Sequence, residues 1–316
     1  MREYVKENEF DAKMADAVIP YLEKRAAKRT CEARGGGTLY AVHYTADDPR
    51  GTLVLVHGFS ENADKYREFI YYLLREHYSV LIFDQRGHGR SHREAPVNVV
   101  HVDRFEQYAE DLEDVLAAYG SSLTAPLFLF AHSMGGAVSM LFLQKHPNVF
   151  KKAVLSAPLV SLQYRGLVRV CAASACRFCT LTGRAKKTVF IAKRDYENEP
   201  FERSSALSPA RFAYLKSLRM SDPLLCGGAP SYAWSLAAIG ITKKLLDKRA
   251  LARVKLPVLI LSAEIEHLVC PDAQQKLARA LPDGHFKKVH GSKHEILFAS
   301  DDILHPVLDE ILDFLQ

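Results

Sequence analysis

Residues 126–147 read PLFLFAHSMGGAVSMLFLQKHP, a pattern typical of a sharp strand-to-helix turn inside a parallel sheet. The run at 126–130 has the length and apolar content of a buried strand, and apolar residues recur at helical spacing over 138–143. Because so few residues separate the two, the chain must turn abruptly between them. Such a turn forces its central residue, Ser133, into a strained backbone conformation and requires small neighbours.

Those neighbours are Ala131, Gly135 and Gly136. Ser133 then stands clear of the sheet at a helix N-terminus, where backbone amides and the helix dipole favour developing negative charge. The pattern is that of a nucleophile elbow, although the usual form has glycine where this chain has Ala131. The alternative is an ordinary Ser-Gly turn before a helix, which the flanking sequence disfavours.

The 316 residues, 48% hydrophobic and 25% charged, are enough for one large core and an insertion. The N-terminal segment is charged throughout, and no stretch approaches the roughly 20 apolar residues of a membrane span. We therefore expect a soluble protein, or one that touches a membrane only at its surface. The six cysteines are too few and too irregularly spaced for a disulfide framework, so we expect free thiols in a reducing compartment.

Positive charge is concentrated in one part of the chain. Residues 158–250 contain 16 lysines and arginines against 6 acidic residues, and the remainder contains 26 against 31. No nucleic-acid-binding motif accompanies this charge, so we expect no nucleic-acid partner. A phosphate-bearing substrate or an anionic lipid surface accounts for the basic segment. Cys176 and Cys179 have metal-ligand spacing, but nothing completes a site, so we expect no metal.

Strands and helices alternate along most of the chain. Strands are predicted at 38–44, 52–56, 78–84, 126–130, 151–158, 256–264 and 285–289, and helices at 10–29, 62–76, 103–119, 271–281 and 302–315. This order predicts an α/β fold with a mostly parallel, doubly wound sheet. The alternation stops over 159–250, which we call the cap segment. We expect it to be a helical cap, or lid, inserted after the strand at 151–158. The core would comprise 35–158 and 251–316, preceded by a helical extension over 1–34.

A serine hydroxyl needs a base to remove its proton, and that base needs an acid to orient it. In this architecture the order along the chain is serine, acid, histidine. His294 follows the last predicted strand on a loop that Gly291 frees to turn, which makes it the candidate base. The other histidines near the C-terminus lie beside the strand, too early, or in the last helix: His285, His290 and His305.

The candidate acid lies in the loop AEIEHLVCPD after the strand at 256–264. Glu266 stands where this architecture usually places the acid, which is more often aspartate than glutamate. Glu264 and Asp272 are the alternative acids, and Glu264 ranks next after Glu266. The sequence alone leaves the choice between Glu264 and Glu266 open.

A second loop follows the carboxyl end of the strand at 52–56 and reads HGFSENADKY. The carboxyl ends of parallel strands build active sites, so the amide of Phe59 can face the nucleophile. Together with the amide of Met134 it would form an oxyanion hole. We expect His57 to organise this loop, because His294 is better placed to act as base.

The motifs HGFSENADKY, FDQRGHGRS, FAHSMGG and GSKHEILF, in this order, resemble the α/β-hydrolase superfamily in its monoacylglycerol lipase and lysophospholipase branch. The cap motif RMSDPLLCGGAPSYAWS and the loop AEIEHLV are similar to the bacterial inner-membrane lysophospholipases. The resemblance implies Ser133 as nucleophile, His294 as base and Glu266 as orienting acid, with oxyanion donors at Phe59 and Met134. It also implies a lysophospholipase that acts through an acyl-serine, needs no cofactor and works in the cytoplasm, peripherally at the inner face of the membrane.

Within the cap segment, basic and apolar residues interleave over 159–187. We expect Arg165, Arg169 and Trp234, together with Phe59, to contact the substrate. The segment can lie on an anionic bilayer or pack its apolar side on the core, and both alternatives stay open. The competing functions are a monoacylglycerol lipase or general carboxylesterase, a peptidase of the same fold, and a binding protein without catalysis.

Overall fold

The computed structural model describes residues 2–163, 166–189 and 199–316. Its main sheet has the order β1-β2-β4-β3-β6-β7-β9-β10. The pairs β1–β2 and β2–β4 are antiparallel and all other pairs are parallel. The strands are β1 (Ala26–Glu32), β2 (Thr38–Tyr44), β3 (Gly51–Val56), β4 (Tyr78–Phe83), β6 (Leu127–His132), β7 (Lys152–Ser156), β9 (Val258–Ile265) and β10 (Gly284–Lys293).

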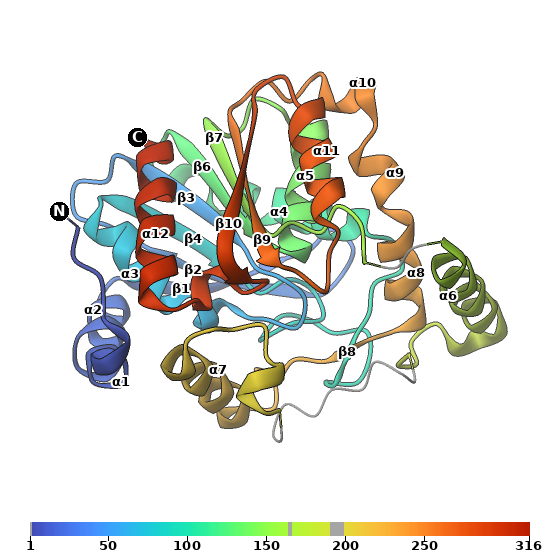
Figure 1. Ribbon diagram of the computed structural model, residues 1–316, viewed down its shortest axis with the longest axis horizontal. Helices are drawn as coiled ribbons and strands as arrows, with labels where there is room; N and C mark the ends of the chain where they lie inside the picture. The colour runs from blue at the N-terminus through green and yellow to red at the C-terminus, as the bar shows by residue number, and fades with distance from the viewer. Residues whose placement is uncertain (1, 164–165, 190–198) are drawn as a thin grey trace.

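Helices cover both faces of this sheet, as expected for a doubly wound fold (Figure 1). One face packs against α3 (Arg67–Arg75) and α12 (Asp301–Leu315), and the other against α4 (Glu106–Tyr119), α5 (Met134–Lys145) and α11 (Pro271–Ala280). Side chains of β3 alternate between the two faces of the sheet. Leu53 and Leu55 pack on the face that α3 and α12 cover, and Val54 and Val56 pack on the face that α4, α5 and α11 cover. A strand buried on both faces must be apolar throughout, which is why the sequence predicts it so clearly.

The N-terminal region departs from the prediction of a helix over 10–29 with a break near Pro20. Helical turns run from α1 (Phe10–Lys13) through a π-helical turn to α2 (Ile19–Glu23), and the chain then forms strand β1. This strand pairs with β2 at the edge of the sheet, with the glycine-rich turn at 33–37 between them. Most side chains of β1 stay exposed, so its sequence carries no apolar signal.

The cap segment follows β7, the sixth strand of the main sheet along the chain. Its described part contains α6 (Gly166–Cys179), α7 (Pro209–Ser221), α8 (Tyr232–Gly240), α9 (Thr242–Leu245) and α10 (Lys248–Leu251). A two-residue strand, β8 (Ala229–Pro230), pairs with β5 (Val99–Val100) outside the main sheet. Helix α7 lies beyond the ends toward which β9 and β10 point, and α6 stands at the outer edge against α8 (Figure 1). Among the described helices, none is both long and apolar enough to cross a membrane.

A buried arginine anchors α7 to the core. Arg211 is fully buried and donates to Glu68 at 2.8 and 2.9 Å and to Asp301 at 2.9 Å. Burial alone would lower the pKa of Arg211, but the hydrogen bonds and charges of the two carboxylates raise it above its usual value. The arginine is therefore charged and paired on both sides.

We expect Arg211→Met to lower the free energy of unfolding by about 3–5 kcal/mol, because it leaves partly buried carboxylates without their cation. Urea titration followed by circular dichroism measures this change. The control is Lys145→Met, whose exposed ammonium lies 3.4 Å from Glu113 and should cost less than about 1 kcal/mol. Equal losses in the two variants would contradict the role given to Arg211.

Candidate active site

Ser133 lies at the turn between β6 and α5 with φ 50° and ψ −116°, a backbone conformation that is strained for a residue with a side chain. Its amide donates to the carbonyl of Ser156 on β7 at 3.0 Å, which holds the turn in place. A Cβ atom at Gly135 would lie 2.1 Å from the Val56 carbonyl oxygen, and one at Gly136 would lie 2.5 Å from Pro158. Only glycine therefore fits at these two positions, as the elbow pattern predicts.

His294 follows β10 and bridges two of the predicted site residues. Its Nε2 lies 2.9 Å from the Ser133 hydroxyl, and its Nδ1 lies 2.6 Å from Oε2 of Glu266. The carboxylate can only accept, so Nδ1 carries the proton and Nε2 is free to accept the serine proton. His294 and Glu266 are both buried, whereas Ser133 is partly exposed and accessible to a substrate.

Glu266 is fixed at both carboxylate oxygens. While Oε2 contacts His294, Oε1 accepts hydrogen bonds from the amides of Leu268 at 2.8 Å and Val269 at 3.3 Å. Burial alone would raise the pKa of Glu266, but His294 and the two amides lower it below its usual value. The carboxylate is therefore ionised and held in one orientation.

The two rival acids lie elsewhere. Glu264 is exposed and accepts from the Gly291 amide at 2.9 Å, with Lys288 at 2.7 Å and His290 at 3.2 Å. The Gly291 amide, together with Lys288 and His290, lowers the pKa of Glu264 to about 2. Its carboxylate thus braces the end of β10. Asp272 lies in the first turn of α11.

The loop after β3 contains Phe59, whose amide is one of the two predicted oxyanion donors. His57 is fully buried there: its Nδ1 contacts the Gly58 carbonyl at 2.7 Å, and its Nε2 accepts from the amide of Gln85 at 2.9 Å. Burial lowers the pKa of His57 to about 4, so the ring is neutral and braces the loop. The amide of Met134 is in the first turn of α5, where N–H groups have no acceptor within the helix.

The predicted substrate contacts fall in different places. Phe59 and Trp234 pack together with ring centroids 4.3 Å apart, next to the predicted oxyanion loop. Arg169 on α6 donates to the Ile239 carbonyl at 2.7 Å, so it fastens α6 to α8. Arg165 lies outside the described residues. A cleft adjoins His294 between the segment 199–205 and the loop 265–268.

Sequence reasoning missed several residues around this site: Gln85, Glu61, Lys65, His132 and Glu295. Gln85 donates to the His57 carbonyl at 2.6 Å. The other four form a cluster in which Glu61, Lys65 and His132 are buried and Glu295 is partly exposed. Two of these residues could have been identified by their positions in the sequence, because His132 directly precedes the predicted nucleophile and Glu295 directly follows the predicted base. Nothing in the sequence indicates that they meet.

The chain resembles known proteins over most of its length. A family model named Hydrolase_4, described as "Serine aminopeptidase, S33", matches residues 47–301. Lysophospholipase L2 of Escherichia coli K12 is 31% identical over 294 residues, which cover 87% of this chain and 83% of that protein. Monoglyceride lipase of Rattus norvegicus is 26% identical over 268 residues, which cover 83% of this chain and 81% of that protein.

A solved structure confirms the predicted fold. The crystal structure of a soluble variant of monoglyceride lipase from Saccharomyces cerevisiae matches with a TM-score of 0.72, over 92% of this chain and 95% of that one. At 19% identity this likeness concerns the fold alone. The family model and the E. coli relative also support assignment of the chain to a family. The chain belongs to the Hydrolase_4 family of α/β-hydrolases and is a serine hydrolase of the group that includes lysophospholipases and monoacylglycerol lipases.

Proposed function

We propose that this protein hydrolyses carboxylic esters through Ser133 as nucleophile, His294 as general base and Glu266 as the acid that orients it. The observation that carries the proposal is the unbroken chain of hydrogen bonds from the Glu266 carboxylate through His294 to the Ser133 hydroxyl, at 2.6 and 2.9 Å. These contacts give the histidine the tautomer that a base needs.

The reaction follows from this geometry. Ser133 Oγ attacks the ester carbonyl carbon while His294 Nε2 takes the hydroxyl proton. The carbonyl oxygen becomes an oxyanion and accepts from the amides of Phe59 and Met134. When the tetrahedral intermediate collapses, His294 gives its proton to the leaving alcohol and an acyl-serine remains. Water then attacks the acyl-serine, loses a proton to His294 and releases the carboxylic acid, and the serine regains its proton.

The substrate class we propose is lysophospholipids, from which the enzyme would release a free fatty acid. Two observations support it: the relative named lysophospholipase L2 and the positive charge of the cap segment, which suits a phosphate-bearing headgroup. Monoacylglycerols and other carboxylic esters are the alternative, since the rat relative is a monoglyceride lipase. We further propose that residues 159–250 form a cap over the carboxyl ends of the strands.

Fatty-acid release measured side by side from lysophosphatidylethanolamine, lysophosphatidylglycerol and 1-monoacylglycerol tests the substrate class, with Ser133→Ala as the blank. We expect release from the lysophospholipids to be faster and to vanish in the blank. Faster release from monoacylglycerol would overturn the lysophospholipid assignment but keep the ester chemistry. An amino-acid 4-nitroanilide belongs in the same panel, because the family model is described as a serine aminopeptidase. Hydrolysis of the anilide alone would overturn ester hydrolysis.

We also propose that the cap segment contacts an anionic membrane surface peripherally. Leu167, Val170 and Phe178 on α6 are 79%, 61% and 64% exposed, so they do not pack on the core. Exposed basic side chains lie in the same stretch of the sequence: Arg177, Arg184, Lys186 and Lys187. An exposed apolar stripe flanked by cations suits an anionic bilayer.

The double variant Leu167→Ser/Phe178→Ser should bind phosphatidylglycerol vesicles about 10-fold more weakly, because it removes apolar side chains that would enter the bilayer. Co-sedimentation with vesicles measures this, with phosphatidylcholine vesicles as the reference for charge. The matched control is Leu123→Ser, a partly buried leucine in the connection before β6. Unchanged binding by the double variant would contradict membrane contact through α6.

A further inference from the structure

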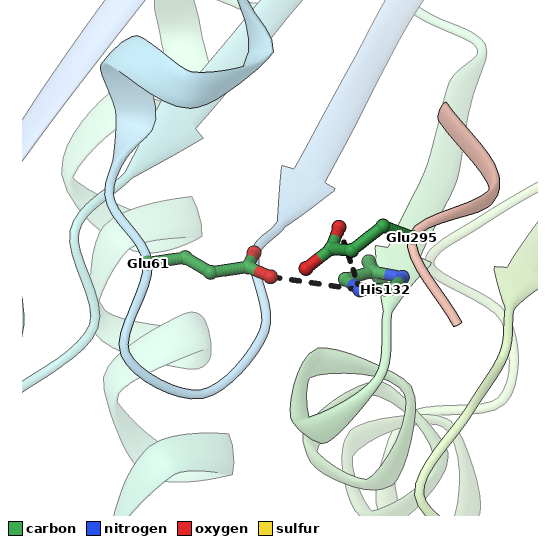
Figure 2. Close-up of side chains that lie close together, drawn as sticks. All are labelled: Glu61, His132 and Glu295. Atoms are coloured by element: carbon green, nitrogen blue, oxygen red, sulfur yellow. Dashed lines mark ion pairs between the residues drawn. The ribbon is translucent and has the colours of Figure 1, made fainter. Parts of the chain in front are cut away.

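A cluster of charged and titratable side chains lies beside Ser133 and His294: Glu61, Lys65, His132 and Glu295. Lys65, Glu61 and His132 are 2%, 6% and 3% exposed. Figure 2 shows Glu61, His132 and Glu295 reaching toward one another from three separate segments of the chain. None of these four residues has a part in the reaction proposed above.

Lys65 joins the two carboxylates. Its ammonium group donates to Oε1 of Glu61 at 2.6 Å and to Oε2 of Glu295 at 2.5 Å. The other oxygen of Glu61 accepts from the Gly58 amide at 2.7 Å and from the Tyr66 hydroxyl at 2.6 Å. Glu61, Lys65 and Glu295 therefore form a continuous chain of hydrogen bonds that starts at the backbone of the loop after β3.

The cluster is built around a lysine rather than a metal ion. Glu61, His132 and Glu295 each offer a ligand atom within 4.8 Å of the others. The Lys65 ammonium, however, already contacts both carboxylates and supplies the positive charge that a cation would bring. Burial alone would raise the pKa of both carboxyls, but Lys65 helps to lower them below their usual values. Two ionised carboxylates thus share one lysine.

Each member of the cluster adjoins a group of the proposed reaction. Glu295 directly follows His294, and His132 directly precedes Ser133. Gly58, which Glu61 holds, directly precedes Phe59. In addition, the ring centroids of His132 and His294 are 5.0 Å apart. Lys65 therefore connects the loop after β3 with the loop after β10.

We propose that Lys65 is a positioning residue that ties the loop carrying the Phe59 amide to the loop carrying His294. Through Glu61 and Glu295, it holds the oxyanion donor and the base at the distances that attack by Ser133 requires. This inference rests on the proposed ester hydrolysis. A buried ion pair is poor evidence of stabilisation, since apolar side chains of similar volume often do as well or better. We therefore expect Lys65 to matter for the placement of the two loops rather than for the stability of the fold.

The test measures kcat and KM for hydrolysis of p-nitrophenyl butyrate, a soluble ester that needs no lipid surface. Lys65→Met should lower kcat about 10- to 100-fold, because displacing a catalytic group by about 1 Å costs up to about 100-fold. KM should change less than about threefold, since the contacts that bind the ester stay in place. Lys65→Arg keeps the charge and the donors, so it should recover most of the lost kcat.

Two further variants separate positioning from folding. Lys65→Met/Glu295→Gln removes the contacts of Lys65 but keeps the net charge of the cluster. It therefore tests the positioning role of Lys65 even if Lys65→Met fails to fold. It should show the same loss of kcat. The matched control is Asp301→Asn, which removes one of the two carboxylates on another buried cation, Arg211. Its kcat should stay within about threefold of the unmodified protein, even if it unfolds at a lower temperature.

The outcomes distinguish this inference from the function on which it rests. If the unmodified protein hydrolyses no ester, ester hydrolysis itself is wrong. If it is active and both the folded Lys65→Met protein and the double variant keep kcat within about threefold, the positioning role of Lys65 is overturned. If Asp301→Asn lowers kcat as much as Lys65→Met does, the positioning role of Lys65 is also overturned. The loss of kcat would then follow from removing any buried charge.

Discussion

Ser133→Ala should lower kcat for ester hydrolysis by about 10⁴-fold or more, because removing the nucleophile of a catalytic triad leaves only binding and the oxyanion hole. The fold should be unaffected, since alanine is smaller than serine and the Ser133 backbone keeps its bonds to Ser156, Gly136 and Leu159. Steady-state hydrolysis of p-nitrophenyl butyrate measures the loss, and circular dichroism checks the fold.

Ser139→Ala is the matched control for this variant. Ser139 is fully buried in the same helix, α5, and among the described residues its hydroxyl has no hydrogen-bond partner. Its activity should stay within about threefold of the unmodified protein. Retention of most of the activity by Ser133→Ala would contradict the assignment of the nucleophile.

Glu266→Gln should lower kcat about 10³- to 10⁴-fold, because an amide in place of the carboxylate no longer secures the tautomer of His294 that accepts the serine proton. KM should change little, because Glu266 is buried, contacts His294 and does not line the cleft that adjoins His294. The same ester assay, fitted for kcat and KM separately, measures both values.

Glu264→Gln is the matched comparison, since it makes the same change two residues earlier. Glu264 contacts Lys288, His290 and Gly291 rather than His294, so its loss should leave kcat within about threefold. Near-normal turnover by Glu266→Gln together with loss in Glu264→Gln would reverse the choice of acid. The sequence left that choice open because both glutamates lie in one short loop.

The sequence predicted the central sheet well because its strands are buried on both faces. Strands β3 and β4 are mostly apolar and have no exposed residue. Ser133 and Glu266 could be placed for a related reason, because each follows the carboxyl end of a mostly buried strand, β6 or β9. His294 follows β10, a partly exposed edge strand, and parallel strands bring all of these carboxyl ends to one edge of the sheet. Spatial proximity of the three therefore follows from the strand order alone.

Features that depend on contacts between distant segments were not predictable. Strand β1 is held by backbone pairing at the sheet edge, and its exposed side chains carry no pattern. The helical pattern over 103–119 predicts a mostly solvated acidic face, yet Asp111 is fully buried and pairs with Arg86 at 2.6 Å. The link from Glu61 through Lys65 to Glu295 likewise joins loops more than 200 residues apart.

We assign Ser133 as the nucleophile that His294 activates. A fluorophosphonate reacts covalently with an activated serine, and peptide mass spectrometry locates the adduct. We predict one adduct per chain, on Ser133, with ester hydrolysis lost in proportion to labelling, and no labelling of the folded His294→Ala variant on the same timescale. An adduct on another residue, or full ester hydrolysis by a completely labelled protein, would contradict the account.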